Sequence, residues 1–239
     1  MTQHILQGRT EDEVLWYQRR SFLKNAAAWT ALGGFDTAFA QRRSNVVDFQ
    51  GDILINGSKL LPQQAIQTGD ALQTGPGSML IFVIGNTSFQ VRQNSRITVE
   101  RGASINAVSV LRMISGAVGA VWGKGVSRQI ITPTLTAGIR GTGIYSEIFP
   151  DQNGRSYFCN CYGEVAMDVG REKTLNIAQY HRAYWIETEA TTKDGRLLVP
   201  AKAFNHTDEE QEYLARLVNQ RCTWQITGVK GSADGSQGY

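Results

Sequence analysis

Hydrophobic positions occur in short runs separated by turn residues, beginning at Val46. Residues 78–86 combine an apolar run with a Gly-Asn turn, and residues 88–91 alternate between polar and apolar side chains. Turn signals recur about every 8 to 12 residues, a spacing typical of all-β folds rather than of alternating strands and helices. We therefore predict an all-β fold with a sandwich or a stacked, roll-like β architecture.

The pattern changes near residue 207. Thr207 and Glu210 have the spacing of a capping box, which marks the start of a helix. Apolar side chains then recur at helical spacing at Tyr213, Leu214, Leu217 and Val218. The pattern predicts one C-terminal α-helix near residues 208–220 that packs on the sheet. The Gly- and Ser-rich residues 228–239 predict a flexible tail.

The N-terminal region has the features of an export signal. Its motif matches the twin-arginine signal closely and consists of Arg19, Arg20, Phe22, Leu23 and Lys24. A weakly apolar run follows and ends in Ala38-Phe39-Ala40, a pattern that signal peptidases cleave. The alternative is an amphipathic helix with a chance arginine pair, but three features in register favour the signal. We expect residues 1–40 to be removed after Ala40 and the protein to be periplasmic, exported by the twin-arginine route.

Composition excludes several classes of protein. The net charge of +3 is too small to indicate a nucleic-acid partner. No apolar run approaches the roughly 18 residues that a membrane span needs. The sequence also lacks a nucleophile elbow, a His-Glu-x-x-His motif and a dinucleotide fingerprint after a strand, so we do not expect an enzyme.

Glycines are concentrated within residues 132–148. Gly138, Gly141 and Gly143 favour two short strands joined at a glycine corner, with Arg140 and Thr142 inside it. One interpretation of Arg140 is structural: it caps strand-end carbonyls or pairs with a buried carboxylate. The other is that Arg140 and Thr142 bind an anionic ligand or a partner.

Three segments together resemble the signatures of the FecR domain. They are Thr132-Pro133 followed by Arg140-Gly141-Thr142, the turn at residues 68–78, and the strand that begins Tyr162-Gly163-Glu164-Val165. The resemblance spans roughly residues 47–169 and implies a FecR-like β domain over residues 41–190, followed by a C-terminal extension over residues 191–239. It also implies a periplasmic relay that detects a partner at the envelope. The familiar membrane-anchored members carry a cytoplasmic anti-sigma segment and a transmembrane helix. We expect neither here, which favours a free adaptor or ligand-binding module.

The cysteines are the main candidates for chemistry. Residues i and i+2 of a strand share a face, so Cys159 and Cys161 could bind one soft metal, zinc or copper(I). Candidate further ligands are His181 and His206, with His181 the stronger candidate. Alternatively, the thiols are packing residues, or one of them forms a disulfide with Cys222. We favour one cross-link and one free thiol, because neither histidine has metal-ligand spacing to the cysteine pair.

Two functions follow from these observations. The first is a non-catalytic periplasmic FecR-domain binding or signalling module that recognises an unidentified envelope protein or a small ligand, without a cofactor. The second is a periplasmic metal-binding or redox protein that uses Cys159 and Cys161, with zinc or copper as the cofactor.

Overall fold

The structure is a computed structural model that describes residues 44–102, 107–125 and 128–231. The predicted export signal, including its cleavage site after Ala40, lies outside these residues. The described strands are β1 (Val46–Gln50), β2 (Ile53–Ile55), β3 (Ser58–Lys59), β4 (Ala71–Thr74), β5 (Met79–Ile84), β6 (Thr87–Val91), β7 (Arg96–Arg101), β8 (Val108–Trp122), β9 (Arg128–Ile131), β10 (Thr136–Phe149), β11 (Arg155–Val169), β12 (Glu172–Ala178), β13 (Arg182–Ile186) and β14 (Leu198–Ala201). The helices are the 3-10 helix η1 (Pro150–Gln152), α2 (Asp208–Leu217) and α3 (Thr223–Thr227).

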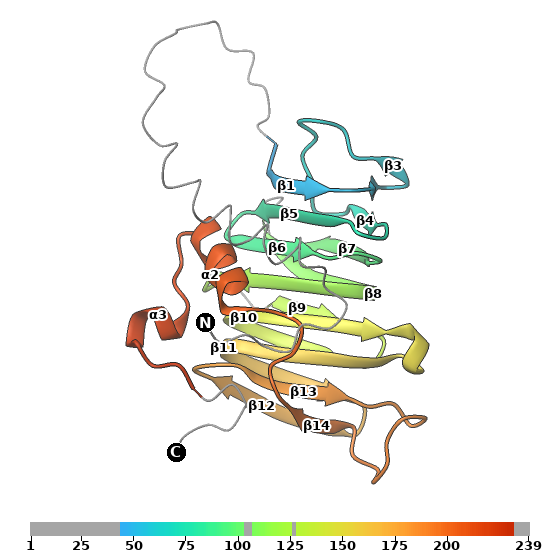
Figure 1. Cartoon of the computed structure of the whole chain (residues 1–239), viewed down its shortest axis with the longest axis vertical. Helices are drawn as coiled ribbons and strands as arrows, with labels where there is room; N and C mark the ends of the chain where they lie inside the picture. Colours follow the sequence, from blue (N-terminus) through green and yellow to red (C-terminus); the bar gives the residue numbers. More distant parts are fainter. Residues whose placement is uncertain (1–43, 103–106, 126–127, 232–239) are drawn as a thin grey trace, which may run out of the picture.

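The strands form two stacked layers that are joined by three long strands (Figure 1). The first layer contains β1, β5, β6, β13 and β14, together with the second halves of β8 and β10 and the first half of β11. The second layer contains β2, β3, β4, β7, β9 and β12, together with the remaining halves of the long strands. The predicted all-β class with a stacked architecture is confirmed.

Each long strand changes layer at a glycine with positive φ. These residues are Gly116 in β8 (φ +81°), Gly141 in β10 (φ +63°) and Gly163 in β11 (φ +97°). L-residues rarely adopt this conformation, whereas glycine adopts it without steric cost. In β10, residues before Gly141 pair with β9, and residues from Gly143 onward pair with β8. The glycines therefore let three strands contribute to both layers.

The prediction of two short strands joined at a glycine corner is wrong. Residues 136–149 are one strand with irregular register between Arg140 and Gly143, as in a β-bulge, and not two strands joined by a turn. Thr134 and Leu135, whose residue types favour strands, lie in the turn that precedes β10. Some bulges and some turns both place a glycine at positive φ, so the glycines alone did not distinguish them.

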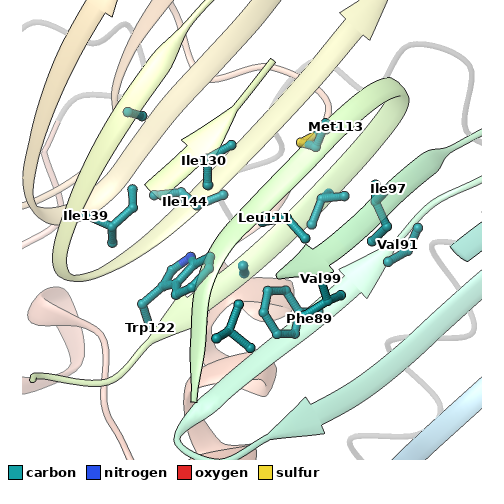
Figure 2. Close-up of a cluster of buried hydrophobic side chains, with 14 of the residues drawn as sticks. Phe89, Val91, Ile97, Val99, Leu111, Met113, Trp122, Ile130, Ile139 and Ile144 are labelled. Atoms are coloured by element: carbon teal, nitrogen blue, oxygen red, sulfur yellow. The ribbon is translucent and has the colours of Figure 1, made fainter. Parts of the chain in front are cut away.

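The main hydrophobic core lies between the two layers. Figure 2 shows Phe89 and Trp122 of the first layer near Leu111 of the second. The Phe89 ring meets Trp122 edge-on with ring centroids 5.3 Å apart, and all three side chains are fully buried. Burial of a side chain of this size contributes about 1.5–3 kcal/mol. This core holds the layers together and leaves the outer face of the first layer for other packing.

The C-terminal segment covers that outer face. Helix α2 begins with the predicted capping box, in which the Thr207 hydroxyl accepts from the Glu210 amide and the Glu210 carboxylate accepts from the Thr207 amide. The predicted helix is confirmed but ends at Leu217, and the short helix α3 follows it. Strand β14 falls within the predicted extension and pairs with β13, so the sheet continues beyond residue 190. Within the described residues, no helix is both long and apolar enough to cross a membrane.

Candidate metal centre

Cys159 and Cys161 lie on the outer face of the first layer. Alternation along β11 directs Phe158 into the core between the layers, whereas Tyr157, Cys159 and Cys161 belong to a second hydrophobic cluster beneath α2. Both sulfurs are fully buried, and their Sγ atoms lie 4.0 Å apart. The prediction that the two cysteines share a face is confirmed.

Two histidines complete the cluster. His181 lies in the turn between β12 and β13, and its amide donates to the Cys161 carbonyl at 3.0 Å. His206 directly precedes Thr207, the N-cap of α2. Both imidazoles are buried. The capping box at Thr207 fixes the start of α2, and with it the position of the preceding residue, His206.

The four side chains surround one point. One ligand atom from each of Cys159, Cys161, His181 and His206 lies within 4.8 Å of all the others. The His181 Nδ1 atom is 3.5 Å from Cys159 Sγ and 3.0 Å from His206 Nε2. A tetrahedral zinc with two sulfur and two nitrogen ligands would give about 3.8 Å between sulfurs, about 3.5 Å from sulfur to nitrogen and about 3.3 Å between nitrogens. The distances from Cys159 to Cys161, from Cys159 to His181 and from His181 to His206 are close to these values.

The other nitrogen of each imidazole has a partner of its own. His206 Nδ1 donates to the Phe204 carbonyl at 2.6 Å, since a carbonyl oxygen can only accept. His181 Nε2 donates to the Asp208 carboxylate at 2.9 Å. Such hydrogen bonds are typical of metal-ligating histidines, because they fix the tautomer and orient the ring. In neutral imidazoles they direct the lone pairs of His181 Nδ1 and His206 Nε2 toward each other, so a cation or a proton is needed between them.

The groups around Cys159 favour its thiolate form. Burial opposes ionisation there, but a hydrogen bond from Cys161 and the nearby His206 and His181 hold the pKa of Cys159 well below its usual value. Burial and the neighbouring Cys159 raise the pKa of Cys161 well above its usual value. Burial also opposes protonation of His181, but hydrogen bonds to Asp208 and Cys159 raise its pKa to about 9. These shifts favour a thiolate at Cys159 beside a protonated His181.

Aromatic rings enclose the imidazoles. Tyr145 stacks on His206 with ring centroids 4.7 Å apart, and Trp224 of α3 stacks on His181 at 5.2 Å. The Tyr157 hydroxyl donates to the Lys202 carbonyl and accepts from the Phe204 amide, both at 3.0 Å. These contacts fix the chain just before His206. Cys159, Cys161, His181 and His206 are all buried beneath these rings.

The cysteines form no disulfide in the structure. Cys159, Cys161 and Cys222 are all free and buried. The cross-link to Cys222 that the sequence favoured is therefore not formed in the structure, in which Cys159 and Cys161 lie beside His181 and His206. The inference failed because histidines at turns and helix starts converge through the fold, without any fixed spacing in sequence.

Arg140 and Thr142 lie apart from this cluster. The Arg140 side chain is 77% exposed, and its Nη1 is 3.1 Å from Oε1 of its cross-strand neighbour Glu164. The Thr142 hydroxyl is buried and donates to Asn160 Oδ1 at 2.8 Å. The structure thus separates the two predicted binding residues, with only Arg140 reaching the surface.

Two of the three segments that carry the FecR resemblance meet in space. The Arg140–Glu164 pair joins these two, and a side chain at Gly163 would lie 2.7 Å from Thr142 Cβ. Arg140-Gly141-Thr142 and Tyr162-Gly163-Glu164-Val165 therefore form one unit at the bends of β10 and β11.

Comparisons with known proteins leave the family open. No family model and no curated protein matches the sequence. Two crystal structures of a "putative anti-sigma factor" from Parabacteroides distasonis ATCC 8503 are similar, each with 9% identity and a TM-score of 0.46. The similarity covers 62% of this chain and spans 64% and 63% of those chains. This likeness is too distant to identify the family or the function.

Proposed function

We propose that the protein holds one zinc ion at Cys159, Cys161, His181 and His206. The observation that carries this proposal is the convergence of two sulfurs and two imidazole nitrogens, with the other ring nitrogens hydrogen-bonded to Phe204 and Asp208. Two thiolates and two neutral imidazoles balance a divalent ion. Tetrahedral sites with these ligands are typical of zinc, so copper(I) is the second choice.

The proposed zinc is structural and non-catalytic. Four protein ligands leave no position for water or substrate. Cys159 and Cys161 belong to the sheet, whereas His206 belongs to the segment that leads into α2. The ion therefore fastens the C-terminal segment to the first layer, and part of its binding free energy stabilises the fold.

Metal analysis of the purified protein tests this proposal. We expect one zinc per chain in the wild type and in Cys222→Ala, which removes a buried thiol outside the cluster. Cys159→Ala and His206→Ala should each lose most of the zinc. With cobalt(II), the wild type should show the intense visible bands of a tetrahedral thiolate site. Copper in place of zinc would correct the choice of metal, and a metal-free wild type that takes up neither ion would refute the site.

We also propose that this scaffold is an exported, FecR-like binding module. Support comes from the meeting of two signature segments, Arg140-Gly141-Thr142 and Tyr162-Gly163-Glu164-Val165, and from the exposure of Arg140 on the outer side of the second layer. The partner is an envelope protein or a small ligand in the periplasm. A photo-crosslinking amino acid at position 140 should capture a periplasmic protein if the partner is a protein. The same amino acid at Arg171, which pairs with Glu189 near the β11–β12 turn, is the control.

A further inference from the structure

Residues 222–231 contact His181, Tyr180 and Asp208 beside the proposed metal centre, and we call them the C-terminal strap. The strap starts at the buried Cys222, forms α3 and turns back at Gly228, which has φ +72°. Its outer surface includes the exposed Ile226 and Val229. The strap contributes none of the four metal-ligand side chains.

Two side chains fix the strap over His181. The Trp224 ring stacks on the imidazole, with an interplanar angle of 29°, and meets Tyr180 edge-on at 5.3 Å. Lys230 Nζ lies 2.5 Å from Oδ2 of Asp208, whose Oδ1 accepts from His181 Nε2. Lys230 is thus connected to a metal-ligand side chain through one carboxylate.

The Lys230–Asp208 pair lies at the boundary between the site and solvent. The Lys230 side chain is 45% exposed, and that of Asp208 is 2% exposed. Tyr180 donates its hydroxyl hydrogen to the same Asp208 oxygen at 3.2 Å. A buried carboxylate is costly without such partners, so the lysine favours a closed strap.

The strap is hydrogen-bonded to α2, whereas α2 is hydrogen-bonded to the sheet. Its backbone hydrogen bonds run within the strap, from Gly228 to Trp224 and from Gln225 to Cys222. To the rest of the described chain it is tied through side chains, including the bond from Trp224 Nε1 to Glu212 at 2.7 Å. Helix α2 is bonded to the sheet. The Ser88 hydroxyl donates to its Leu214 carbonyl, and its Gln211 side chain donates to the Ile144 carbonyl.

We propose that the C-terminal strap is the gate for metal exchange, and that Lys230 is the positioning residue that keeps it closed. This inference rests on the proposed metal centre. All four ligands are buried, so an ion can leave only after part of the cover moves. Opening the strap breaks its hydrogen bonds to Glu212 and Asp208 of α2, whereas opening α2 also breaks hydrogen bonds to the sheet residues Ser88 and Ile144. The gate sets the rate of exchange and leaves the ligand set unchanged.

The rate of zinc release from the full-length, zinc-loaded protein to an excess of a chromogenic chelator measures how fast the strap opens. We expect Lys230→Met, which keeps an apolar stem, to release zinc about tenfold faster than wild type, as for loss of a hydrogen bond between charged groups. Lys230→Arg should restore the slow rate. Lys173→Met is the matched control. Lys173 of β12 lies in the second layer, and its Nζ is 2.7 Å from the Asp168 carboxylate of β11.

Cobalt spectra separate gating from damage to the site. The visible bands of cobalt-loaded Lys230→Met should match wild type, because all four ligands remain. Trp224→Phe provides a second variant that weakens the strap and should also accelerate release. Wild-type release rates in both variants would overturn the gate while leaving the zinc site intact. A wild type that takes up no metal would instead refute the zinc site itself.

Discussion

His181 Nδ1 lies 3.0 Å from His206 Nε2, although the two residues belong to different structural segments. His181 belongs to the turn before β13, and His206 ends the loop that leads into α2. Each ring is oriented by the hydrogen bond that its other nitrogen donates, to the Asp208 carboxylate in one case and to the Phe204 carbonyl in the other. With Cys159 and Cys161 beside them, the two nitrogens define a site for one cation.

Metal removal should lower thermal stability. A ligand present at 1,000 times its Kd stabilises the folded state by about 4 kcal/mol. For a chain of this size, that corresponds to a fall in Tm of about 8–16 °C when a chelator strips the metal. Calorimetry with and without chelator measures the difference.

The matched control for this measurement is Cys161→Ser. Without one thiolate, the melting temperature should become insensitive to chelator. An equal response of wild type and Cys161→Ser would show that the chelator acts elsewhere.

Thiol chemistry should distinguish the metal centre from a disulfide. We expect a non-reducing peptide map without a cross-link, because Cys159, Cys161 and Cys222 are free in the structure. In the native zinc protein, alkylation should be slow at all three positions. After chelation in denaturant, all three should react. A peptide joining Cys222 to Cys159 or Cys161 would contradict the structure and support the cross-link that the sequence favoured.

Gly141→Val should destabilise the fold. Gly141 has φ +63°, and a Cβ there would lie 3.0 Å from Lys124 Cγ. A β-branched residue held in this conformation costs about 1–3 kcal/mol. Denaturant unfolding monitored by tryptophan fluorescence would measure the loss.

Gly138→Ala is the comparison for Gly141→Val. Gly138 lies in the same strand without a positive φ, and an added Cβ would make an ordinary 3.7 Å contact with Ala166. We expect a much smaller change in stability. Equal losses for the two variants would mean that the bend at Gly141 is not the origin of the effect.

Export depends on Arg19 and Arg20 if the N-terminal motif is a twin-arginine signal. Replacing both with lysine should leave the uncleaved precursor in the cytoplasm, whereas the wild type should have Gln41 as its first residue in the periplasm. Fractionation followed by N-terminal sequencing tests both points. The lysine exchange at Arg42 and Arg43, a second pair beyond the cleavage site, is the control. Normal export of the Arg19/Arg20 variant would refute the signal.

The sequence determined the local features of this protein. Short apolar runs with frequent turns indicated stacked strands, and Thr207 with Glu210 marked the start of α2. The side-chain alternation of a strand placed Cys159 and Cys161 on one face. Each of these conclusions depends on residues that are close in sequence, where backbone geometry alone fixes their relative positions.

Only the tertiary structure decided which residues form the proposed metal centre. His181 and His206 reach the cysteines because β13 pairs with β11 and because α2 packs on the outer face of the first layer. It also decided that Gly141 forms a bend within one strand, since that depends on β10 pairing with β9 before the glycine and with β8 after it. These contacts join residues far apart in the chain. Strand pairing and packing set them, and no local pattern in the sequence encodes them.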